Sequence, residues 1–460
     1  MRRFFDRATV FIATLILLAL MLSLLSSLTV RKEAYVNSKP FYEHSEQYDI
    51  LFFGTSHVRN GILPLELWMD FGYVSYNLAS SGATLPMSYW SIVNALDYSE
   101  PQLLVLDCCR VSHPDISSGV SYVHTMTDSM PLSSNKIRAA FDLGGDTSYA
   151  LELLCPFSIY HARWEELSME DFSPKLSVTH GVTLSLNVAV PNEFALTDDS
   201  MALTEEMTGV AYLEKIIQLC RSRNIQLLLT YLPYPATLDE VKEANGLAKL
   251  ARKYGVDYIN FLTMDTVDLD TDMYDSFSHL NYSGAQKVSR YIGNYISQHY
   301  DIPDRREDEG FSWMGEDLSE YQAYLEDLLR NESYLFNYLL LLRQYSAASA
   351  IYVAEDSPVY DNETILKLIE NVPLAAKPNL LRQAAQNKTD YLLFVNNADG
   401  EIQEYLGEDI PKVLDTGIGT LNIDSFPIIG CQVYNGNTGE SLGCDRSFHE
   451  VYGEGYVREY

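Results

Sequence analysis

The sequence predicts an α/β protein with a parallel sheet, an N-terminal transmembrane helix and a small C-terminal α/β domain. Three observations lead to this prediction. An uncharged apolar segment opens the chain, short apolar runs then alternate with helical patterns up to about residue 300, and a charged stretch precedes a second region with its own strand-like runs. Strands that alternate with helices favour a parallel sheet covered on both faces. With 460 residues, the chain is long enough for two globular domains and an anchor.

The first element is the segment 8–30, which contains no charged residue. As a helix it would extend about 34 Å, enough to cross the hydrocarbon core of a bilayer. Arg2, Arg3 and Arg7 precede it and favour a cytoplasmic N-terminus. A cleaved signal peptide is the alternative, but the segment is longer than a usual signal core and lacks an A-x-A site. We therefore expect a single-pass protein of the cell membrane whose main domain is extracytoplasmic.

The remaining elements follow in order along the chain. We expect an N-terminal stub and anchor over 1–33, the main α/β domain over 45–300, a linker over 301–317 and an accessory domain over 318–460. Apolar runs predict strands at Tyr48–Phe53, Tyr73–Leu78, Leu103–Leu106, Gln226–Tyr231 and Tyr258–Leu262. Helical patterns cover Met87–Leu96, Gly209–Arg223, Leu238–Tyr254, Gly284–His299 and Leu318–Gln344.

The charge of the chain excludes some classes of partner. It has 63 acidic and 32 basic side chains, a formal net charge of −31. Such a negative field disfavours nucleic acid and anionic lipid surfaces. The sequence has no CxxC pair and no His/Cys grouping with the spacing of zinc ligands. We therefore expect no nucleic-acid partner, no metal and no cofactor.

Two signals mark the ends of the first predicted strands. Ser56 follows the first strand directly, in Gly54-Thr55-Ser56-His57, and Gly82 follows the second. Ligands of an open parallel sheet bind at the carboxyl ends of its strands. A helix that begins near Ser56 would offer free N–H groups to an oxyanion. A helix-capping serine and an ordinary strand-to-helix turn are the alternatives for these two positions.

The strongest signal is His279, on a loop before the last helix of the main domain. A serine hydroxyl needs a neutral imidazole to accept its proton and a third group to orient that imidazole. Asp275 is the expected orienting acid, and Asp272 is a second candidate. A lone histidine is more often structural, but its setting in His279-Leu280-Asn281 favours catalysis.

Gly54-Thr55-Ser56, Gly82 and His279-Leu280-Asn281 resemble the Ser, Gly and His blocks of the SGNH/GDSL hydrolase superfamily. The chain is more closely similar to membrane-anchored bacterial members related to the D-alanyl-lipoteichoic-acid biosynthesis protein D and to alginate O-acetyltransferases. Tyr160-His161-Ala162-Arg163-Trp164 resembles a Y-H-x-R-W motif of that subgroup. The resemblance covers about residues 45–300 and implies a flavodoxin-like three-layer sandwich.

The resemblance also implies a function. It implies serine-dependent transfer of an acetyl or D-alanyl group, or ester hydrolysis, on exported cell-envelope polysaccharides or glycolipids. A membrane-bound O-acyltransferase is the protein partner that it implies. Ser56, His279 and Asp275 would be catalytic, and Gly82, Arg163 and His161 would serve the oxyanion or bind substrate.

Two departures from the family pattern leave a different class of function open. Position 276, where the family normally has its acid, is a serine, and Asp107-Cys108-Cys109-Arg110 stands where the family has an oxyanion-hole asparagine. Arg110 and Arg163 are candidates for the missing donor, although salt bridges explain them equally well. The alternative function is an inactive surface scaffold, which an unpaired His279 would favour.

Overall fold

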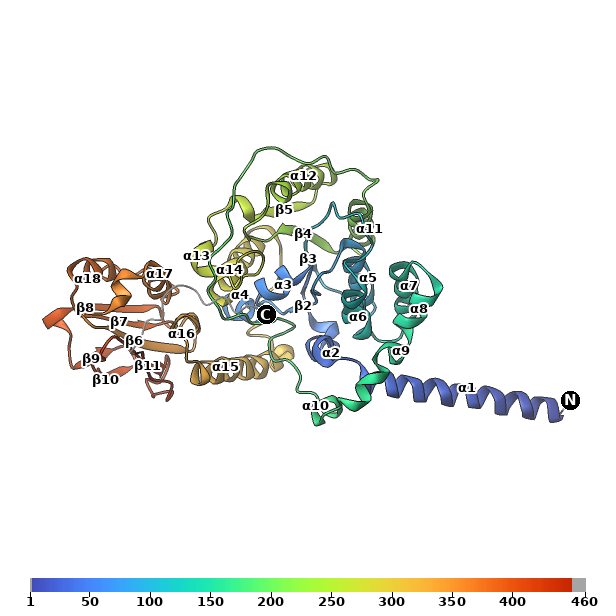
Figure 1. Ribbon diagram of the computed structural model, residues 1–460, viewed down its shortest axis with the longest axis horizontal. Coiled ribbons are helices and arrows are strands. Elements are labelled where there is room, and N and C mark those ends of the chain that lie inside the picture. Colours follow the sequence, from blue (N-terminus) through green and yellow to red (C-terminus); the bar gives the residue numbers. More distant parts are fainter. Residues whose placement is uncertain (1, 449–460) are drawn as a thin grey trace.

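A computed structural model describes residues 2–448 (Figure 1). It contains a five-stranded parallel sheet, a separate five-stranded antiparallel sheet in the C-terminal part and a long apolar helix at the N-terminus. The α/β class, the parallel sheet and the apolar N-terminal helix are thereby confirmed.

The parallel sheet has the strand order β2-β1-β3-β4-β5, and all neighbouring strands are parallel. Strands β1 and β3 are buried along their whole length, which explains why their sequences are continuous apolar runs. The residues that follow β1, β2, β3 and β4 meet at one edge of the sheet. The strands are β1 (Ile50–Phe53), β2 (Ser75–Asn77), β3 (Leu103–Asp107), β4 (Gln226–Tyr231) and β5 (Asp257–Asn260).

Helices cover the two faces of this sheet (Figure 1). On one face α5 and α11 pack against each other, and on the other α14 packs against α3 and α4. The apolar positions Val288, Ile292 and Ile296 of α14 are fully buried, as their spacing predicts. The helices are α3 (Ser56–Gly61), α4 (Pro64–Phe71), α5 (Leu85–Ala95), α11 (Thr208–Ser222), α12 (Leu238–Tyr254) and α14 (Tyr282–His299).

A helical insertion between β3 and β4 has no counterpart in the predicted elements. Its first three helices form a small core with α5, which includes Met87 of α5 and Val123, Leu143 and Leu153 of the insertion. The last three elements lie beside the end of α1 (Figure 1). The insertion consists of α6 (Val120–Asp128), α7 (Ser134–Gly144), α8 (Thr147–Leu154), α9 (Phe157–Tyr160), η3 (His161–Glu165) and α10 (Met169–Phe172).

The N-terminal helix α1 runs from Arg2 to Thr29 and projects from the body of the protein (Figure 1). Its segment Thr9–Thr29 has 21 residues and a mean hydropathy of 2.5, and very little of it is buried. The segment is therefore long and apolar enough to cross a membrane. A signal anchor and a signal peptide both have this property. A short helix, α2 (Lys32–Ser38), follows it.

The C-terminal part is an antiparallel sheet of order β12-β11-β6-β7-β8 with helices packed on it. The region Leu318–Gln344, expected to be helical, contains two helices with a short break between them. The side chain of Glu332 accepts hydrogen bonds from the N–H groups of Ser333 and Tyr334, which ends the first of them. The elements are α15 (Trp313–Asn331), α16 (Leu335–Leu341), β6 (Ala347–Val353), α17 (Glu363–Asn371), α18 (Leu381–Asn387), β7 (Tyr391–Asn396), β8 (Glu401–Leu406), β9 (Val413–Thr416), β10 (Gly419–Asn422), β11 (Ile429–Asn435) and β12 (Arg446–Phe448).

The segment 301–317, expected as a linker, packs closely on the main domain. The guanidinium of Arg305 binds the carboxylate of Asp49 at 3.0 and 3.1 Å. Trp313 stacks on His44 with 4.0 Å between the ring centroids. One apolar core extends from the parallel sheet through α15 and α16 to the antiparallel sheet.

Glu66 on α4 is buried near this junction. Its carboxylate accepts hydrogen bonds from the hydroxyl of Tyr282 at 2.8 Å and from the amide of Gln286 at 3.2 Å. Burial, which outweighs these hydrogen bonds, raises the pKa of Glu66 from 4.5 to about 7. The side chain is therefore protonated in the folded protein over a range of pH in which the unfolded chain has already lost the proton.

We expect Glu66→Gln to alter how stability depends on pH. The contribution of Glu66 to the free energy of unfolding of the wild type should fall by about 3 kcal/mol as the pH rises from about 4.5 to 7, because the unfolded state releases the Glu66 proton first. The variant lacks this proton, so its stability relative to wild type should rise over the same interval. Chemical unfolding at a series of pH values measures the difference, and parallel curves for the two proteins would contradict it.

Candidate functional site

Ser56, His279 and Asp275 form a continuous chain of hydrogen bonds. The Nε2 atom of His279 lies 2.8 Å from the hydroxyl oxygen of Ser56, and its Nδ1 atom lies 2.5 Å from a carboxylate oxygen of Asp275. The side chains of His279 and Asp275 are 25% and 21% exposed. With Asp275 ionised, Nδ1 donates to it and Nε2 accepts from Ser56. This is the arrangement that activates a serine hydroxyl.

The backbone around β1 places Ser56 at the edge of the sheet where the strands end. Gly54 has φ +150°, and a Cβ there would lie 2.6 Å from the side chain of Val58 and 3.0 Å from that of Asp107. Only glycine fits so close an approach. The hydroxyl of Thr55 caps α3 by accepting the N–H of His57 at 3.2 Å. Ser56 is the first residue of α3, so its N–H has no acceptor within the helix.

The loop that carries His279 is folded around the carboxylate of Asp275. One carboxylate oxygen accepts the N–H groups of Phe277, Ser278 and His279 at 3.1, 2.7 and 3.1 Å. The N–H of Tyr274 donates to the carbonyl of His279 at 2.8 Å, which closes the loop. The turn therefore accommodates one residue more between acid and base than the resembled family has.

The same hydrogen bonds set the charge of Asp275. Partial burial alone would raise its pKa, but hydrogen bonds from His279 and from the N–H of Ser278 lower it to about 2. Asp275 is therefore ionised at any pH near neutrality. A fixed negative charge beside Nδ1 holds the imidazole in the tautomer that leaves Nε2 free to accept a proton.

Asp272, the second candidate acid, contacts other partners. It is fully buried, pairs with Lys287 at 2.7 Å and accepts the N–H of Asp268 at 2.8 Å. Among the residues that the structure describes, no hydrogen bond joins it to His279. The structure thus brings Asp275, and not Asp272, to the imidazole.

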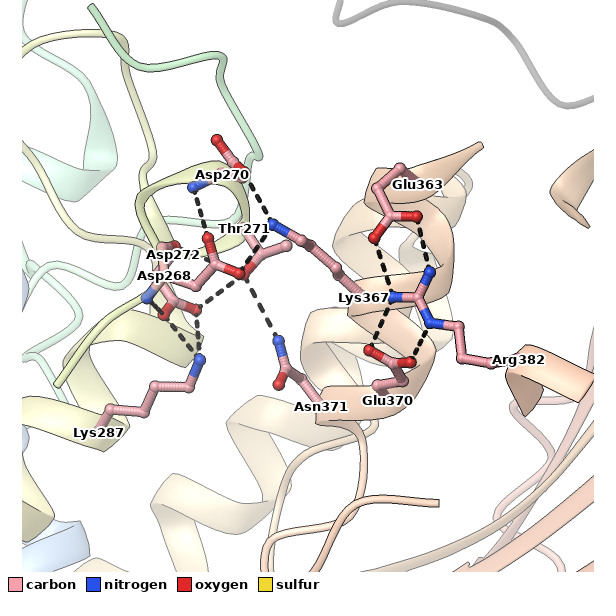
Figure 2. A network of polar contacts seen from close by, with 10 residues as sticks. All are labelled: Asp268, Asp270, Thr271, Asp272, Lys287, Glu363, Lys367, Glu370, Asn371 and Arg382. Carbon is pink, nitrogen blue, oxygen red and sulfur yellow. Dashed lines mark hydrogen bonds and ion pairs between the residues drawn. The ribbon is translucent and has the colours of Figure 1, made fainter. Parts of the chain in front are cut away.

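The C-terminal part supports the loop from the other side (Figure 2). Lys367 on α17 pairs with Asp268 and Asp270 at 3.1 and 2.8 Å, and Asn371 donates to the hydroxyl of Thr271 at 3.5 Å. The acidic residues belong to α13 (Leu269–Asp272) and its cap, three residues before Asp275. Arg382 in turn binds Glu363 and Glu370 of α17. The position of the acid–base loop therefore depends on contacts between the two parts of the chain.

Gly82 lies on the loop after β2, which is attached to the nucleophile turn. The N–H of Ser80 donates to the carbonyl of Gly54 at 3.1 Å, and Arg59 on α3 donates to the hydroxyl of Ser81 at 3.0 Å. Gly82 has φ +64°, and a Cβ there would lie 2.7 Å from the ring of Tyr122. Its backbone conformation therefore requires glycine.

Arg163 and His161 lie in a different environment, at the end of α1. Arg163 donates to the carbonyls of Thr29 and Val30 at 2.6 and 3.0 Å and binds Asp171 at 2.9 Å. His161 contacts the carbonyl of Ser158 through Nδ1. Within residues 2–448, no hydrogen bond connects Arg163 or His161 with the Ser56–His279–Asp275 chain.

The position at which the resembled family has an oxyanion-hole asparagine is held here by a buried acid, Asp107. Asp107, at the end of β3, accepts the N–H groups of Cys109 and Leu232 at 3.3 and 2.9 Å and the hydroxyl of Thr230 at 3.3 Å. Burial raises its pKa to about 7 despite these hydrogen bonds. Arg110 has φ +69° and donates through its side chain to Ser118 at 3.1 Å. Asp107 thus holds β3 and β4 together.

The sequence did not indicate that His57, which adjoins Ser56, is a buried packing residue. Its Nδ1 is buried without a hydrogen-bond partner, and its ring lies 4.4 Å from that of Tyr234. Burial, with a smaller effect of His279, lowers the pKa of His57 to about 3. His57 is therefore neutral and does not compete with His279 as a base.

Within the described residues, one group could offer ligands to a metal ion. Single ligand atoms of His57, Asp107 and Cys109 lie within 4.8 Å of one another. The carboxylate of Asp107 already accepts hydrogen bonds from the N–H groups of Cys109 and Leu232 and from the hydroxyl of Thr230, and the hydroxyl of Thr55 lies 3.8 Å from the sulfur of Cys109. The group fits a packed interior better than a metal centre.

Two asparagines near Gly82 and His279 are structural. The amide of Asn77 donates to the carbonyls of Val58 and Ile62 at the end of α3, at 2.8 and 3.1 Å. Asn281 caps α14 through the N–H of Gly284 and donates to the carbonyl of Thr271. Asn77 therefore stabilises the end of α3, and Asn281 stabilises the start of α14 and the loop before it.

The chain matches no known family model and no curated protein, so its function has to be inferred from the residues of the site.

We expect Asp275→Asn to slow the reaction of Ser56 with a fluorophosphonate probe by roughly 100-fold or more, because the amide cannot hold the imidazole in the accepting tautomer. Asp272→Asn is the matched control. It removes the ionic partner of Lys287 and should lower the midpoint of unfolding, but it leaves the Asp275–His279 contact in place and should slow the reaction far less than Asp275→Asn. Equal rates for Asp275→Asn and wild type would exclude Asp275 as the orienting acid.

Proposed function

We propose that the protein is a serine-dependent acyl-group enzyme of the SGNH/GDSL type. Ser56 is the nucleophile, His279 the general base and Asp275 the orienting acid. The observation that carries the proposal is the hydrogen-bond chain from Ser56 through His279 to Asp275, at 2.8 and 2.5 Å. The strand order β2-β1-β3-β4-β5, which is that of the flavodoxin-like three-layer folds, supports it.

The reaction has two half-reactions. In the first, Oγ of Ser56 attacks the acyl carbonyl while Nε2 of His279 takes the hydroxyl proton, and the departing alcohol oxygen receives that proton as the ester bond breaks. In the second, water or an acceptor hydroxyl gives its proton to His279 and attacks the acyl-serine, and Ser56 regains a proton as it leaves. The products are a free acid or a new ester.

The N–H groups of Ser56 and Gly82 are the proposed oxyanion donors. The loops that carry them are joined by hydrogen bonds to the same turn after β1. Asp107 stands where a third oxyanion donor is expected, and no other donor takes its place in this proposal. The loss of one such donor typically costs about 3 kcal/mol of transition-state stabilisation. A slow enzyme follows from this.

The proposed location is the cell membrane, with α1 retained as a single-pass anchor and the site extracytoplasmic. The side chain of Arg163 supports retention, because its acceptors are the carbonyls of Thr29 and Val30 at the end of the apolar segment. The proposed substrates are acetyl or D-alanyl esters of cell-envelope polysaccharides or glycolipids, and a membrane-bound O-acyltransferase is the proposed partner. Arg163 and His161 then belong to the anchor and not to the oxyanion site.

A catalytically inactive scaffold for such an O-acyltransferase is the second candidate. The observation in its favour is Asp107, which stands in place of a neutral oxyanion donor. A carboxylate near the oxyanion would oppose the developing negative charge whenever it is ionised.

We expect the purified full-length protein to react with a fluorophosphonate probe through Ser56. Ser56→Ala should abolish labelling, and His279→Ala should lower it by about 1000-fold or more because the hydroxyl loses its base. Ester turnover by the double variant should match that of either single variant, since the residues act as one unit. Labelling that persists in Ser56→Ala would disprove the nucleophile, and absence of labelling and turnover in the folded wild type would favour the scaffold.

We further expect transfer to exceed hydrolysis when an acceptor is present. Transfer has to compete with water at about 55 M, so it requires that the acceptor is bound beside the acyl-serine. A time course with an acetyl ester, with and without a cell-envelope oligosaccharide, should show acylated oligosaccharide forming faster than free acetate. Rapid release of acetate that the oligosaccharide does not change would identify an esterase.

A further inference from the structure

Three short elements of the helical insertion lie against the end of α1. These are α9, η3 and α10, which all contact α1 (Figure 1). The N–H of Phe157, the first residue of α9, donates to the hydroxyl of Ser26 at 3.2 Å. Ser26 belongs to the membrane-length segment Thr9–Thr29, one turn before its end. The insertion therefore reaches the level at which the apolar helix ends.

Large apolar side chains are exposed on these same elements. Trp164 is 66% exposed, Met169 is 80% exposed and Phe172 is 59% exposed, and Ile159 adds a fourth. We call these four residues the membrane-proximal apolar surface. Single exposed apolar residues are ordinary on soluble proteins, but a group of them within 14 residues marks an interaction site. Tryptophan, in addition, prefers the headgroup level of a bilayer.

Arg163 fixes this surface relative to α1. Its guanidinium donates to the carbonyl of Thr29, the last residue of α1, to that of Val30 just after it, and to Asp171 of α10. A side chain that binds both elements allows little independent movement. If α1 crosses the bilayer, the surface therefore lies where the chain leaves it.

We propose that the membrane-proximal apolar surface inserts into the interfacial layer of the bilayer beside α1. The main domain then lies against the membrane in one orientation, and it is not suspended from a free tether. The proposal rests on the retention of α1 in the proposed function. The occupant is the uncharged apolar–headgroup boundary of the lipid, because Glu165, Glu166 and Glu170 accompany the surface and the chain carries a net charge of −31. Attachment through apolar burial is insensitive to salt, unlike attachment to anionic lipid.

This orientation has a consequence for the proposed substrate. A glycolipid diffusing in the bilayer, or a polymer attached to one, meets the site in two dimensions. Confinement of enzyme and substrate to one surface raises their effective concentration without any added contact. Ester substrates held in the membrane should therefore be favoured over the same esters in solution.

The test uses the full-length protein in phosphatidylcholine vesicles whose acyl chains carry bromine, which quenches nearby tryptophan. Trp164 should be quenched, and Trp164→Phe should lose most of the quenching. Trp313→Phe is the matched control and should retain it, because Trp313 stacks on His44 in the main domain. Of the other tryptophans, Trp68 is buried and Trp90 binds Asp142. Quenching that survives in Trp164→Phe would overturn the proposal.

Two further arms separate this proposal from the anchor. Quenching should be the same at low and high salt, and salt-labile quenching that requires anionic lipid would overturn the apolar mode. Sedimentation with vesicles and protease protection of α1 test the anchor alone. A chain that sediments without quenching of Trp164 would disprove the apolar surface and leave the anchor intact. A chain that does not sediment would disprove both.

Discussion

The carboxylate of Asp275 is the interaction on which the rest of the site depends. One of its oxygens accepts three backbone N–H groups and so folds the loop, while the other holds Nδ1 of His279 at 2.5 Å. The same charge shapes the backbone and orients the base. Because these hydrogen bonds lower the pKa of Asp275 to about 2, both effects persist at any pH near neutrality.

The loop is stabilised from both sides by charged contacts. Asp272 pairs with Lys287 of α14, and Asp268 and Asp270 pair with Lys367 of the C-terminal part. Asp272 is fully buried, and a buried charge is costly unless paired, so its contact with Lys287 tolerates little displacement. The pairs of Lys367 with Asp268 and Asp270 are partly exposed and contribute less. The C-terminal part therefore influences the position of the base without contacting it. Elsewhere, Arg163 donates to the carbonyls of Thr29 and Val30 and so holds the helical insertion against the end of α1.

Much of the fold follows from local patterns. Continuous apolar runs predict β1, β3 and β4 because parallel strands are buried on both faces, and the uncharged segment 8–30 predicts α1. The helical insertion over 120–172 escaped prediction because many of its apolar residues are exposed, so its short helices lack the regular buried stripe that marks a longer core helix. The break after Asn331 also escaped, since one side chain, that of Glu332, ends the helix.

The sequence alone determined the residue types of the site. Ser56 follows a strand, and His279 lies on a loop with an acid nearby. These residue types restrict the chemistry to a few reactions. Only the tertiary structure decided between Asp275 and Asp272, because the answer depends on which carboxylate the folded loop turns toward the imidazole. The tertiary structure also showed that Arg163 lies away from the site. Nothing in the sequence around Arg163 indicates that it binds the end of α1. The physical reason is common to both cases. Some hydrogen bonds join residues that are far apart in the chain, such as the one from Arg163 to Thr29. Packing determines them, and no local sequence pattern predicts them.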